Sequence, residues 1–279
     1  MSRMKTSKQP FTVVVLAADR ELNDPVARSA AVSCKALTPV AGRAMILRVL
    51  DALAEAKEVG VRILAGPAMA SVEQNVELNG LVSSGQVRWH APQATPSSSA
   101  FSALQSLPEG VPVLVTTADH ALLTAAMVDH FCAEARRSGC DVVAGVARHD
   151  LIAAAFPDTR RTVTRLADGG YCGCNLFAFL TPQARQAADF WRKVEKERKK
   201  PLRIIKVMGM MAVLRYLLGR LTLEQALAGL SRRMKLQAGV VRMPFAEAAV
   251  DVDKVEDWLL VESILAKKTS GSCASDGAP

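Results

Sequence analysis

Aromatic residues are scarce in this chain of 279 residues: they make up 5% of it, and 2 are tyrosines. Proteins that bind single-stranded nucleic acid stack bases on aromatic side chains, so this scarcity argues against a nucleic-acid partner. The 6 cysteines include no C-x-x-C pair, and Cys172 and Cys174 have no further Cys or His at zinc-ligand spacing. We therefore expect reduced thiols and no zinc site.

Long apolar runs and internal repeats are also missing. Lys206 and Arg215 interrupt the most apolar stretch, which falls far short of the roughly 20 residues that span a bilayer. A basic start followed by apolar residues is similar to a secretion signal, but the apolar run stops before Asp19 and no small-residue cleavage site follows. Since 50% of the residues are apolar, the chain can bury a sizeable α/β core. The expected location is the cytoplasm, with the inner face of the membrane as an alternative.

The segment from Val13 to Leu53 has the pattern of a strand, a long loop and a helix. The apolar run from Val13 to Ala18 is typical of a buried parallel strand. The polar stretch that follows, as far as Lys35, is expected to be a loop, and apolar residues from Met45 to Leu53 indicate a helix. Doubly wound, mostly parallel sheets bind ligands at the carboxyl ends of their strands. We therefore expect such an α/β fold, with a ligand site after the first strand.

This segment resembles the first motif of the MobA-like NTP transferases, a nucleotidyltransferase family with a GT-A-like, Rossmann-like fold. That motif reads roughly L-A-G-G-x-G-x-R-x-x-x-x-K-x-L-x-P-x-x-G-x-P-M, and the residues that match it are Leu16, Ala17, Lys35, Leu37, Pro39, Gly42 and Met45. Ala18 and Asp19 replace its paired glycines, and the loop is longer.

The loss of these glycines matters because glycine lets backbone N–H groups approach phosphate closely. The resemblance implies that Leu16, Ala17 and Ala18 line the nucleotide site. Arg20 and Arg28 would replace the glycines through bidentate contacts to phosphate oxygens, with Lys35 as a point charge. The alternative is an ordinary strand–helix unit with solvated loop charges.

A second matching phrase lies in the middle of the chain. Residues 111–117 predict a strand, Ala-Asp-His-Ala-Leu-Leu-Thr follows at 118–124, and Met127 to Arg137 predict a helix. The phrase resembles the family's G-D-x-P-L-L-T, in which the aspartate ligates the Mg²⁺ that bridges the nucleotide phosphates. Mg²⁺ takes one or two carboxylates together with phosphate oxygens and waters. The resemblance therefore implies a metal role for Asp119; in isolation an Asp here is a helix N-cap, and His120 is expected to be structural or solvated.

A serine-rich helix start lies between these two phrases, from Pro96 to Leu104. It resembles the family's segment that faces the base and ribose, which makes Ser97, Ser98 and Ser99 candidate nucleotide contacts. A loop or helix cap is the alternative.

A late phrase, Ala-Val-Asp-Val-Asp-Lys-Val-Glu-Asp-Trp at 249–258, resembles the family's D-x-D-T-P-E-D-L. There a strand ends in an aspartate that completes the metal site, and Asp253 takes that position. Lys254 and Val255 replace Thr and Pro, so the turn is atypical. An acidic helix start with Glu256 and Asp257 in its first turn is the alternative.

The glycine-rich phrase at 169–179 leads into another apolar strand. Similar enzymes have a G-x-N phrase here, with the Asn near the acceptor substrate, so Asn175 is a candidate acceptor contact. A β-bulge or turn also explains the glycines.

The segment 185–238 holds the positive charge of the chain. It contains fourteen Lys or Arg against four Asp or Glu, a net of +10, whereas the whole chain carries +8. We expect a helix from Phe190 to Lys200, a break at Pro201, a helix from Leu202 to Arg220, and another after Thr222 as N-cap. Such an insertion packs an apolar stripe on the sheet or a second subunit, or lies on an anionic membrane or lipid-like phosphorylated substrate.

These patterns together predict an α/β core at 1–184, the basic helical insertion at 185–238, a return to the core at 239–268 and a disordered tail at 269–279. By resemblance the protein transfers a nucleoside monophosphate from an NTP to a phosphorylated acceptor with Mg²⁺ as cofactor. A GT-A glycosyltransferase is the second candidate, although His120 and Ala121 do not continue the D-x-D phrase of that class. A non-catalytic binding protein at the membrane is the third.

Overall fold

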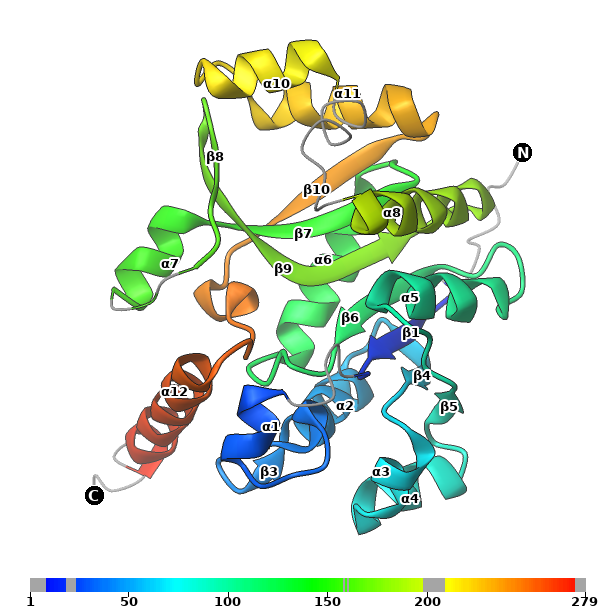
Figure 1. The fold of residues 1–279 in the computed structure, drawn as a ribbon, viewed down its shortest axis with the longest axis vertical. Helices are drawn as coiled ribbons and strands as arrows, with labels where there is room; N and C mark the ends of the chain where they lie inside the picture. Colours follow the sequence, from blue (N-terminus) through cyan, green and yellow to red (C-terminus); the bar gives the residue numbers. More distant parts are fainter. Residues whose placement is uncertain (1–8, 19–23, 158, 160, 198–208, 274–279) are drawn as a thin grey trace, which may run out of the picture.

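A large mixed sheet with helices on both faces forms the centre of the molecule (Figure 1). The fold is described from a computed structural model, which places residues 9–18, 24–157, 159, 161–197 and 209–273. The strand order is β10-β7-β9-β6-β1-β4-β5, with β8 paired to β9. The strands are β1 (Phe11–Leu16), β4 (Val59–Ala65), β5 (Arg88–His90), β6 (Val113–Thr117), β7 (Val142–Arg148), β8 (Thr164–Leu166), β9 (Gly169–Phe179) and β10 (Ala238–Met243).

The sheet is parallel except at β9, which runs antiparallel to both β6 and β7, and at the β8–β9 pair. A small hairpin of β2 (Pro39–Val40) and β3 (Arg43–Ala44) stands apart from it. The helices are α1 (Pro25–Ser29), η1 (Lys35–Leu37), α2 (Met45–Glu55), α3 (Met69–Glu73), α4 (Val76–Ser83), α5 (Pro96–Gln105), α6 (Ala125–Arg137), α7 (His149–Ala155), η2 (Pro182–Ala184), α8 (Arg185–Glu197), α10 (Met210–Leu217), α11 (Leu223–Met234), η3 (Ala246–Ala249) and α12 (Val255–Cys273). The expected doubly wound α/β fold is therefore confirmed.

The alternation of side chains along β1 divides the core into two layers. Val13 and Val15 face the side covered by α2 and α6, where they join a cluster that includes Phe131. Val14 and Leu16 face the opposite side, which α5 and α8 cover. Every residue of β1 is buried, which explains why this strand reads as a continuous apolar run.

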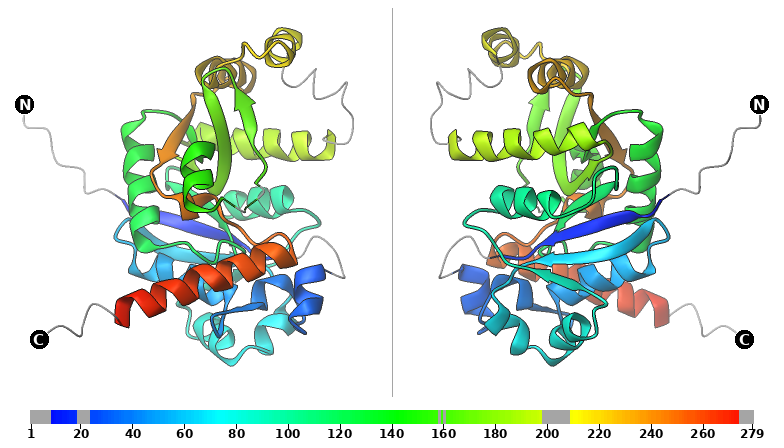
Figure 2. Two further views of the ribbon diagram at one scale, coloured as in Figure 1. Left: turned by 90° about the vertical axis from the view of Figure 1, so that its left-hand side faces the viewer. Right: turned by 90° about the vertical axis from the view of Figure 1, so that its right-hand side faces the viewer.

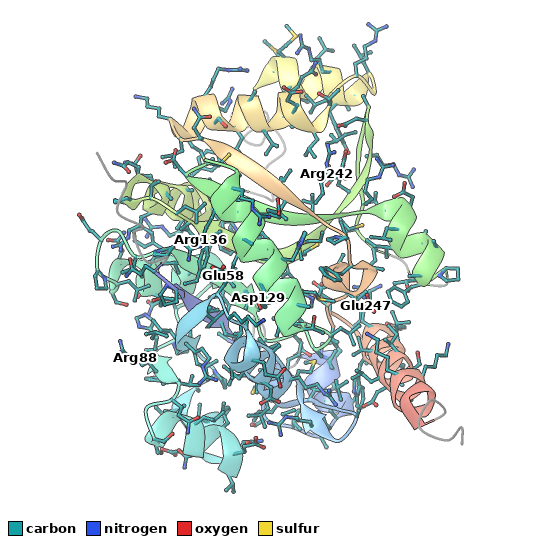
Figure 3. The ribbon with its side chains drawn as sticks, turned by 180° about the vertical axis from the view of Figure 1, so that it is seen from behind. Glu58, Arg88, Asp129, Arg136, Arg242 and Glu247 are labelled. Atoms are coloured by element: carbon teal, nitrogen blue, oxygen red, sulfur yellow. The ribbon has the colours of Figure 1, made fainter. Side chains whose placement is uncertain are left out.

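The back of the molecule shows how β4 is fixed to α6 (Figure 3). The Arg136 guanidinium lies 3.2 Å from a Glu58 carboxylate oxygen, and the Glu58 backbone N–H donates to Asp129 at 3.0 Å. These contacts hold the start of β4 against the covering helix.

The chain changes direction at β1, and this change places the ligand crevice. From β1 the chain moves outward to β4 and β5, and then returns to form β6 on the other side of β1. Open α/β sheets bind ligands at such a switch point, outside the carboxyl ends of the strands. The segments after β1 and β6 are therefore the ones that can meet there.

The basic segment 185–238 divides into parts with different surroundings. Helix α8 packs beside α5 (Figure 2), and its Ala187 and Ala188 are buried in the same cluster as β1. Helix α11 begins after Thr222, which forms the expected N-cap with Gln225. Pro201 and the start of the expected helix from Leu202 lie outside the described residues. The first helix of the basic segment therefore contributes to the core of the sheet.

The last part of the chain departs from expectation in two places. Asp253 does not end a strand: after η3 the chain runs extended without a strand partner until α12 begins at Val255. Helix α12 also continues to Cys273, inside the segment 269–279 that was expected to be disordered. No helix in the described part of the chain combines the length and apolar character needed to cross a bilayer.

Candidate active site

A cavity of about 270 Å³ opens at the carboxyl ends of β1 and β6. The sequence-predicted residues among its lining are Leu16, Ala17, Ala18, Lys35, Ser99, Asp119 and Asp253. The other lining residues, which no sequence pattern singled out as site residues, are Asp24, Pro25, Ala36, Ala65, Pro96, Thr117 and Ala118. Residues from widely separated parts of the chain thus meet at the switch point of the sheet.

Lys35 is the centre of this site. It begins η1, and its ammonium donates to Asp119 Oδ2 at 2.7 Å and to the Val252 carbonyl at 3.0 Å. The Asp253 carboxylate lies 3.5 Å from the same nitrogen. Burial alone lowers the pKa of Lys35, but the neighbouring carboxylates, Asp119 foremost, hold it above its ordinary value. Lys35 is therefore a fixed positive charge in the cavity.

Asp119 follows β6 directly and is held by both side chain and backbone. Its carbonyl accepts a hydrogen bond from the Val252 N–H at 3.0 Å, which ties the late segment to the end of β6. Burial would raise the pKa of Asp119, but the Lys35 ammonium keeps it below its ordinary value. Its Oδ1 atom is buried and accepts no hydrogen bond from the described residues, so it is an unpaired oxygen that a bound ion would satisfy.

Asp253 is positioned by the first turn of α12. Asp257 Oδ2 accepts hydrogen bonds from the backbone N–H groups of Asp253 and Lys254, both at 3.1 Å. The Asp257 side chain thus satisfies N–H groups at the helix start, as an acidic residue in the first turn is expected to do. The Asp253 side chain stays 58% exposed and faces the cavity.

Asp119 and Asp253 are suited to Mg²⁺. Magnesium needs only one or two protein carboxylates, because waters and substrate phosphates complete its coordination. In the described part of the chain no group of three or more His, Cys, Asp or Glu residues could hold a metal, so a site built entirely from protein ligands is not present there. The unbonded Asp119 Oδ1 and the exposed Asp253 carboxylate fit a site in which protein carboxylates, waters and substrate phosphates together hold the ion.

A buried network next to Asp253 was not foreseen from the sequence. Arg161 Nη1 donates to Asp251 Oδ1 at 2.8 Å and to the Asp251 carbonyl at 3.0 Å, while its Nη2 lies 3.4 Å from Asp257. Burial, then the nearby Asp253 and Asp119 charges, raises the pKa of Asp251 to about 6. Only the D-x-D phrase signalled Asp251, and no pattern singled out Arg161.

Asn175 belongs to the same network. It lies on β9 where the register with β7 shifts between Ala144 and Val146, and its φ is +49°. Asn tolerates this left-handed conformation better than most residues. Its side-chain N–H donates to Asp251 Oδ2 at 2.8 Å, and it is not among the residues that line the cavity. The bulge and the polar contact therefore occur at the same residue.

The three serines of α5 face different directions. Ser99 lines the cavity, and its hydroxyl accepts from the Gln93 N–H at 2.9 Å. Ser97 is fully buried and bonds to Glu195 of α8, and Ser98 bonds to the helix N-cap Thr95. Only Ser99 therefore remains a candidate nucleotide contact, because successive helical residues point about 100° apart.

The loop after β1 differs from the expected phosphate clamp. Arg20 lies outside the described residues. Arg28 is exposed on α1 and does not line the cavity, since Val26 and Ala27 form the buried side of that helix. Asp24 lines the cavity instead, and its side chain caps α1 by accepting a hydrogen bond from the Val26 N–H at 2.8 Å.

Ala18 is approached closely by the end of β4. A Cβ atom on Gly66, whose φ is +82°, would lie 3.0 Å from the Ala18 backbone nitrogen. Gly66 is therefore required by the close contact and by its backbone conformation. In this chain a glycine after β4 permits tight packing beside the cavity.

His120 is fully buried, which agrees with a structural role. Burial lowers its pKa to about 4, so the ring is neutral near pH 7.

Comparison with known proteins identifies the family. Residues 13–233 match the MobA-like NTP transferase domain, and the chain belongs to that family. A hypothetical transferase from Thermus thermophilus has a similar structure, with a TM-score of 0.75, 29% identity, and coverage of 89% of this chain and 99% of that one. Curated protein sequences contain no match to this chain.

More distant structures share the fold. The 4-diphosphocytidyl-2C-methyl-D-erythritol synthase of Anaerococcus prevotii has a TM-score of 0.57 at 14% identity, covering 93% of this chain and 97% of its own. The CMP:2-keto-3-deoxy-manno-octonic acid synthetase in complex with CTP has a TM-score of 0.54 at 11% identity, covering 94% of this chain and 100% of its own. The sheet is thus of the nucleotidyltransferase type.

Proposed function

We propose that this protein transfers a nucleoside monophosphate from an NTP to a phosphorylated acceptor and releases pyrophosphate. The observation that carries the proposal is the meeting of Lys35, Asp119 and Asp253 in one cavity at the switch point of the sheet. One cation and two carboxylates are the groups needed to position and neutralise a triphosphate together with a divalent metal ion.

Asp119 and Asp253 would hold Mg²⁺ in this reaction. When bound, the ion would supply positive charge against the negative charge that develops on the phosphate oxygens. The Asp119 backbone is fixed to Val252 through its carbonyl, and the Asp253 backbone is fixed through Asp257, so the main chain that carries both carboxylates is held before substrate binds. Such preorganisation limits the reorganisation needed during the reaction.

Lys35 would neutralise the phosphates from the floor of the cavity. The acceptor phosphate is already a nucleophile, so the reaction does not need a general base. Its oxygen forms a bond to the α-phosphorus of the NTP while the bond from that phosphorus to the α,β-bridging oxygen breaks, and pyrophosphate leaves with the bond's electrons. The protein contributes alignment and positive charge.

Small residues around Ala17 and Ala18 and the hydroxyl of Ser99 would contact the nucleotide. Asn175 remains the candidate on the acceptor side, where it acts by holding Asp251. Asp251 and its partner Arg161 lie next to Asp253, and Arg161 is already paired with Asp251 and Asp257, so an acceptor bound there would not meet an open positive charge.

The direct test is pyrophosphate release from purified protein with each of the four NTPs, Mg²⁺ and a panel of sugar, alcohol and lipid-like phosphates. CTP is the first nucleotide to use, because the synthetase of similar fold is in complex with CTP. We expect release that requires NTP, acceptor and Mg²⁺ together. Nucleotide binding without turnover on any acceptor class would favour a non-catalytic binding protein, and transfer from a nucleotide sugar would favour a glycosyltransferase.

A further inference from the structure

Helix α10 exposes apolar side chains on most of its circumference. Met210 is 78% exposed and Leu217 is 75% exposed, and none of the residues of α10 is buried. The other large apolar side chains exposed on or next to this helix are Met211, Leu214, Tyr216 and Leu218. Contiguous apolar exposure of this kind marks a surface that meets another apolar phase.

The position of α10 leaves this surface uncovered by the rest of the described chain. The helix lies on the outer side of α11, at the end of the molecule farthest from α12 (Figures 1 and 2). Helix α8, in contrast, buries its apolar side on the sheet. The expectation that the basic segment packs an apolar stripe against its own sheet therefore holds for α8 and not for α10.

Positive charge lies next to the exposed apolar side chains. Arg215 lies on α10, Arg220 follows it, and the Arg233 guanidinium of α11 lies next to Gly209, the N-cap of α10; all three arginines are exposed. Over residues 209–235, the acidic residue Glu224 is outnumbered by the basic residues Arg215, Arg220, Arg232, Arg233 and Lys235. The partner of this surface must therefore offer both an apolar phase and negative charge.

We propose that α10 binds the surface of an anionic lipid bilayer, with its apolar side chains in the headgroup boundary and the arginines beside the lipid phosphates. Amphipathic basic helices bind membranes in this way, and their affinity combines buried apolar area with attraction to anionic lipid. At 8 residues α10 is much too short to span a bilayer, so it lies in the plane of the interface. A second copy meeting this face would bring like charges together, which disfavours self-association.

The test is sedimentation of the full-length protein with vesicles of phosphatidylcholine alone and of phosphatidylcholine with anionic phosphatidylglycerol, without nucleotide. The wild type should bind the anionic vesicles at low salt, bind the neutral ones more weakly, and be largely released by salt. Met210→Glu with Leu217→Glu should reduce partitioning by about tenfold or more, since each buried apolar side chain contributes strongly. Arg215→Glu with Arg220→Glu should also reduce it about tenfold or more, since each charge contributes roughly fivefold.

Matched controls lie elsewhere on the surface. Val76 on α4 is 88% exposed and Leu259 on α12 is 60% exposed, so Val76→Glu with Leu259→Glu adds the same charge at other apolar sites. Arg88 is exposed on β5 and far from α10 (Figure 3), so Arg88→Glu is the control for charge reversal at an arginine outside this surface. Circular dichroism and NTP binding show that each variant is folded.

The controls should sediment like the wild type. Wild-type protein that ignores anionic vesicles at low salt would overturn the proposal, as would equal losses in the control variants. If the wild type forms a dimer but does not bind vesicles, and if Met210→Glu with Leu217→Glu dissociates that dimer, this face would be assigned to a second copy. The test does not depend on turnover, so its outcome is separate from that of the proposed reaction.

Discussion

The ammonium of Lys35 lies 2.7 Å from Asp119 Oδ2, although 84 residues separate the two in the sequence. They meet because Lys35 follows β1, Asp119 follows β6, and β1 and β6 are neighbouring parallel strands. The pair raises the pKa of Lys35 and lowers that of Asp119, in each case against the effect of burial. Each residue thus keeps the other charged at neutral pH.

Asp119→Asn and Asp253→Asn should each reduce Mg²⁺-dependent pyrophosphate release by roughly 100-fold or more, as the loss of a group that stabilises charge in the transition state does. Asp253→Asn should leave thermal stability nearly unchanged, because that side chain is 58% exposed. Asp150→Asn, which removes an exposed carboxylate on α7, is the control and should retain full activity. Full activity in both site variants would show that these carboxylates do not bind the catalytic metal.

Lys35→Ala should weaken NTP binding by roughly 10- to 100-fold, the loss expected for one hydrogen bond to a charged group. Titration of the purified variant with each NTP measures this effect. Lys57→Ala, at an exposed position after α2, should bind as the wild type does. Equal dissociation constants for the two variants would remove Lys35 from the nucleotide site.

Arg161→Ala should lower the free energy of unfolding by roughly 3–5 kcal/mol, because it leaves Asp251 and Asp257 without their buried partner. The Arg161 side chain is 7% exposed, whereas that of Arg148, in its pair with Asp150, is 46% exposed. Arg148→Ala should therefore cause no measurable loss in urea unfolding. If Arg161→Ala does not fold, Arg161→Lys should fold with an intermediate loss; wild-type stability in either Arg161 variant would contradict the buried network.

Iodoacetamide should modify Cys140 in the folded protein well before Cys132 or Cys174. Burial raises the pKa of the Cys132 and Cys174 thiols, which suppresses the reactive thiolate, while Cys140 is half-exposed. Peptide mass spectrometry after brief labelling, with and without urea, measures the order. Cys140→Ser is the control for assignment, and rapid native labelling of Cys132 would show that the packing of α6 on the sheet does not bury this thiol.

The strands and helices with strong apolar patterns were predictable from the sequence. The run of Val13 to Ala18 and the helix from Met45 indicated β1 and α2, because each buries enough apolar surface to determine its own conformation. The family motifs also placed Lys35, Asp119 and Asp253, which the structure brings to one cavity. Asp119 lies just after β6, and Lys35 lies in the segment that follows β1, as expected.

The strand expected before Asp253 was wrong for a physical reason. Val250 and Val252 are buried and alternate with polar residues, which is the pattern of a strand. Their burial comes from packing beside Val26 and Met45, without a neighbouring strand. Local alternation reports which side chains are buried and does not identify what covers them.

Arg28 and Ser97 were misplaced because their positions depend on a helix's orientation. Arg28 lies on α1, in a stretch that was expected to be a loop, and it faces away from Val26. Ser97 faces Glu195 on α8, a contact between residues that are 98 positions apart. A single sequence without tertiary contacts does not determine these directions.

The hydrogen bond from Lys35 to the Val252 carbonyl joins residues 217 positions apart. The cavity is therefore complete only when the segment around Val252 has docked beside the end of β6. A chain that lacks this segment keeps β1 and Asp119 but loses Asp253 from the cavity lining. Docking of one late segment thus joins η1, the end of β6 and the start of α12 at a single point.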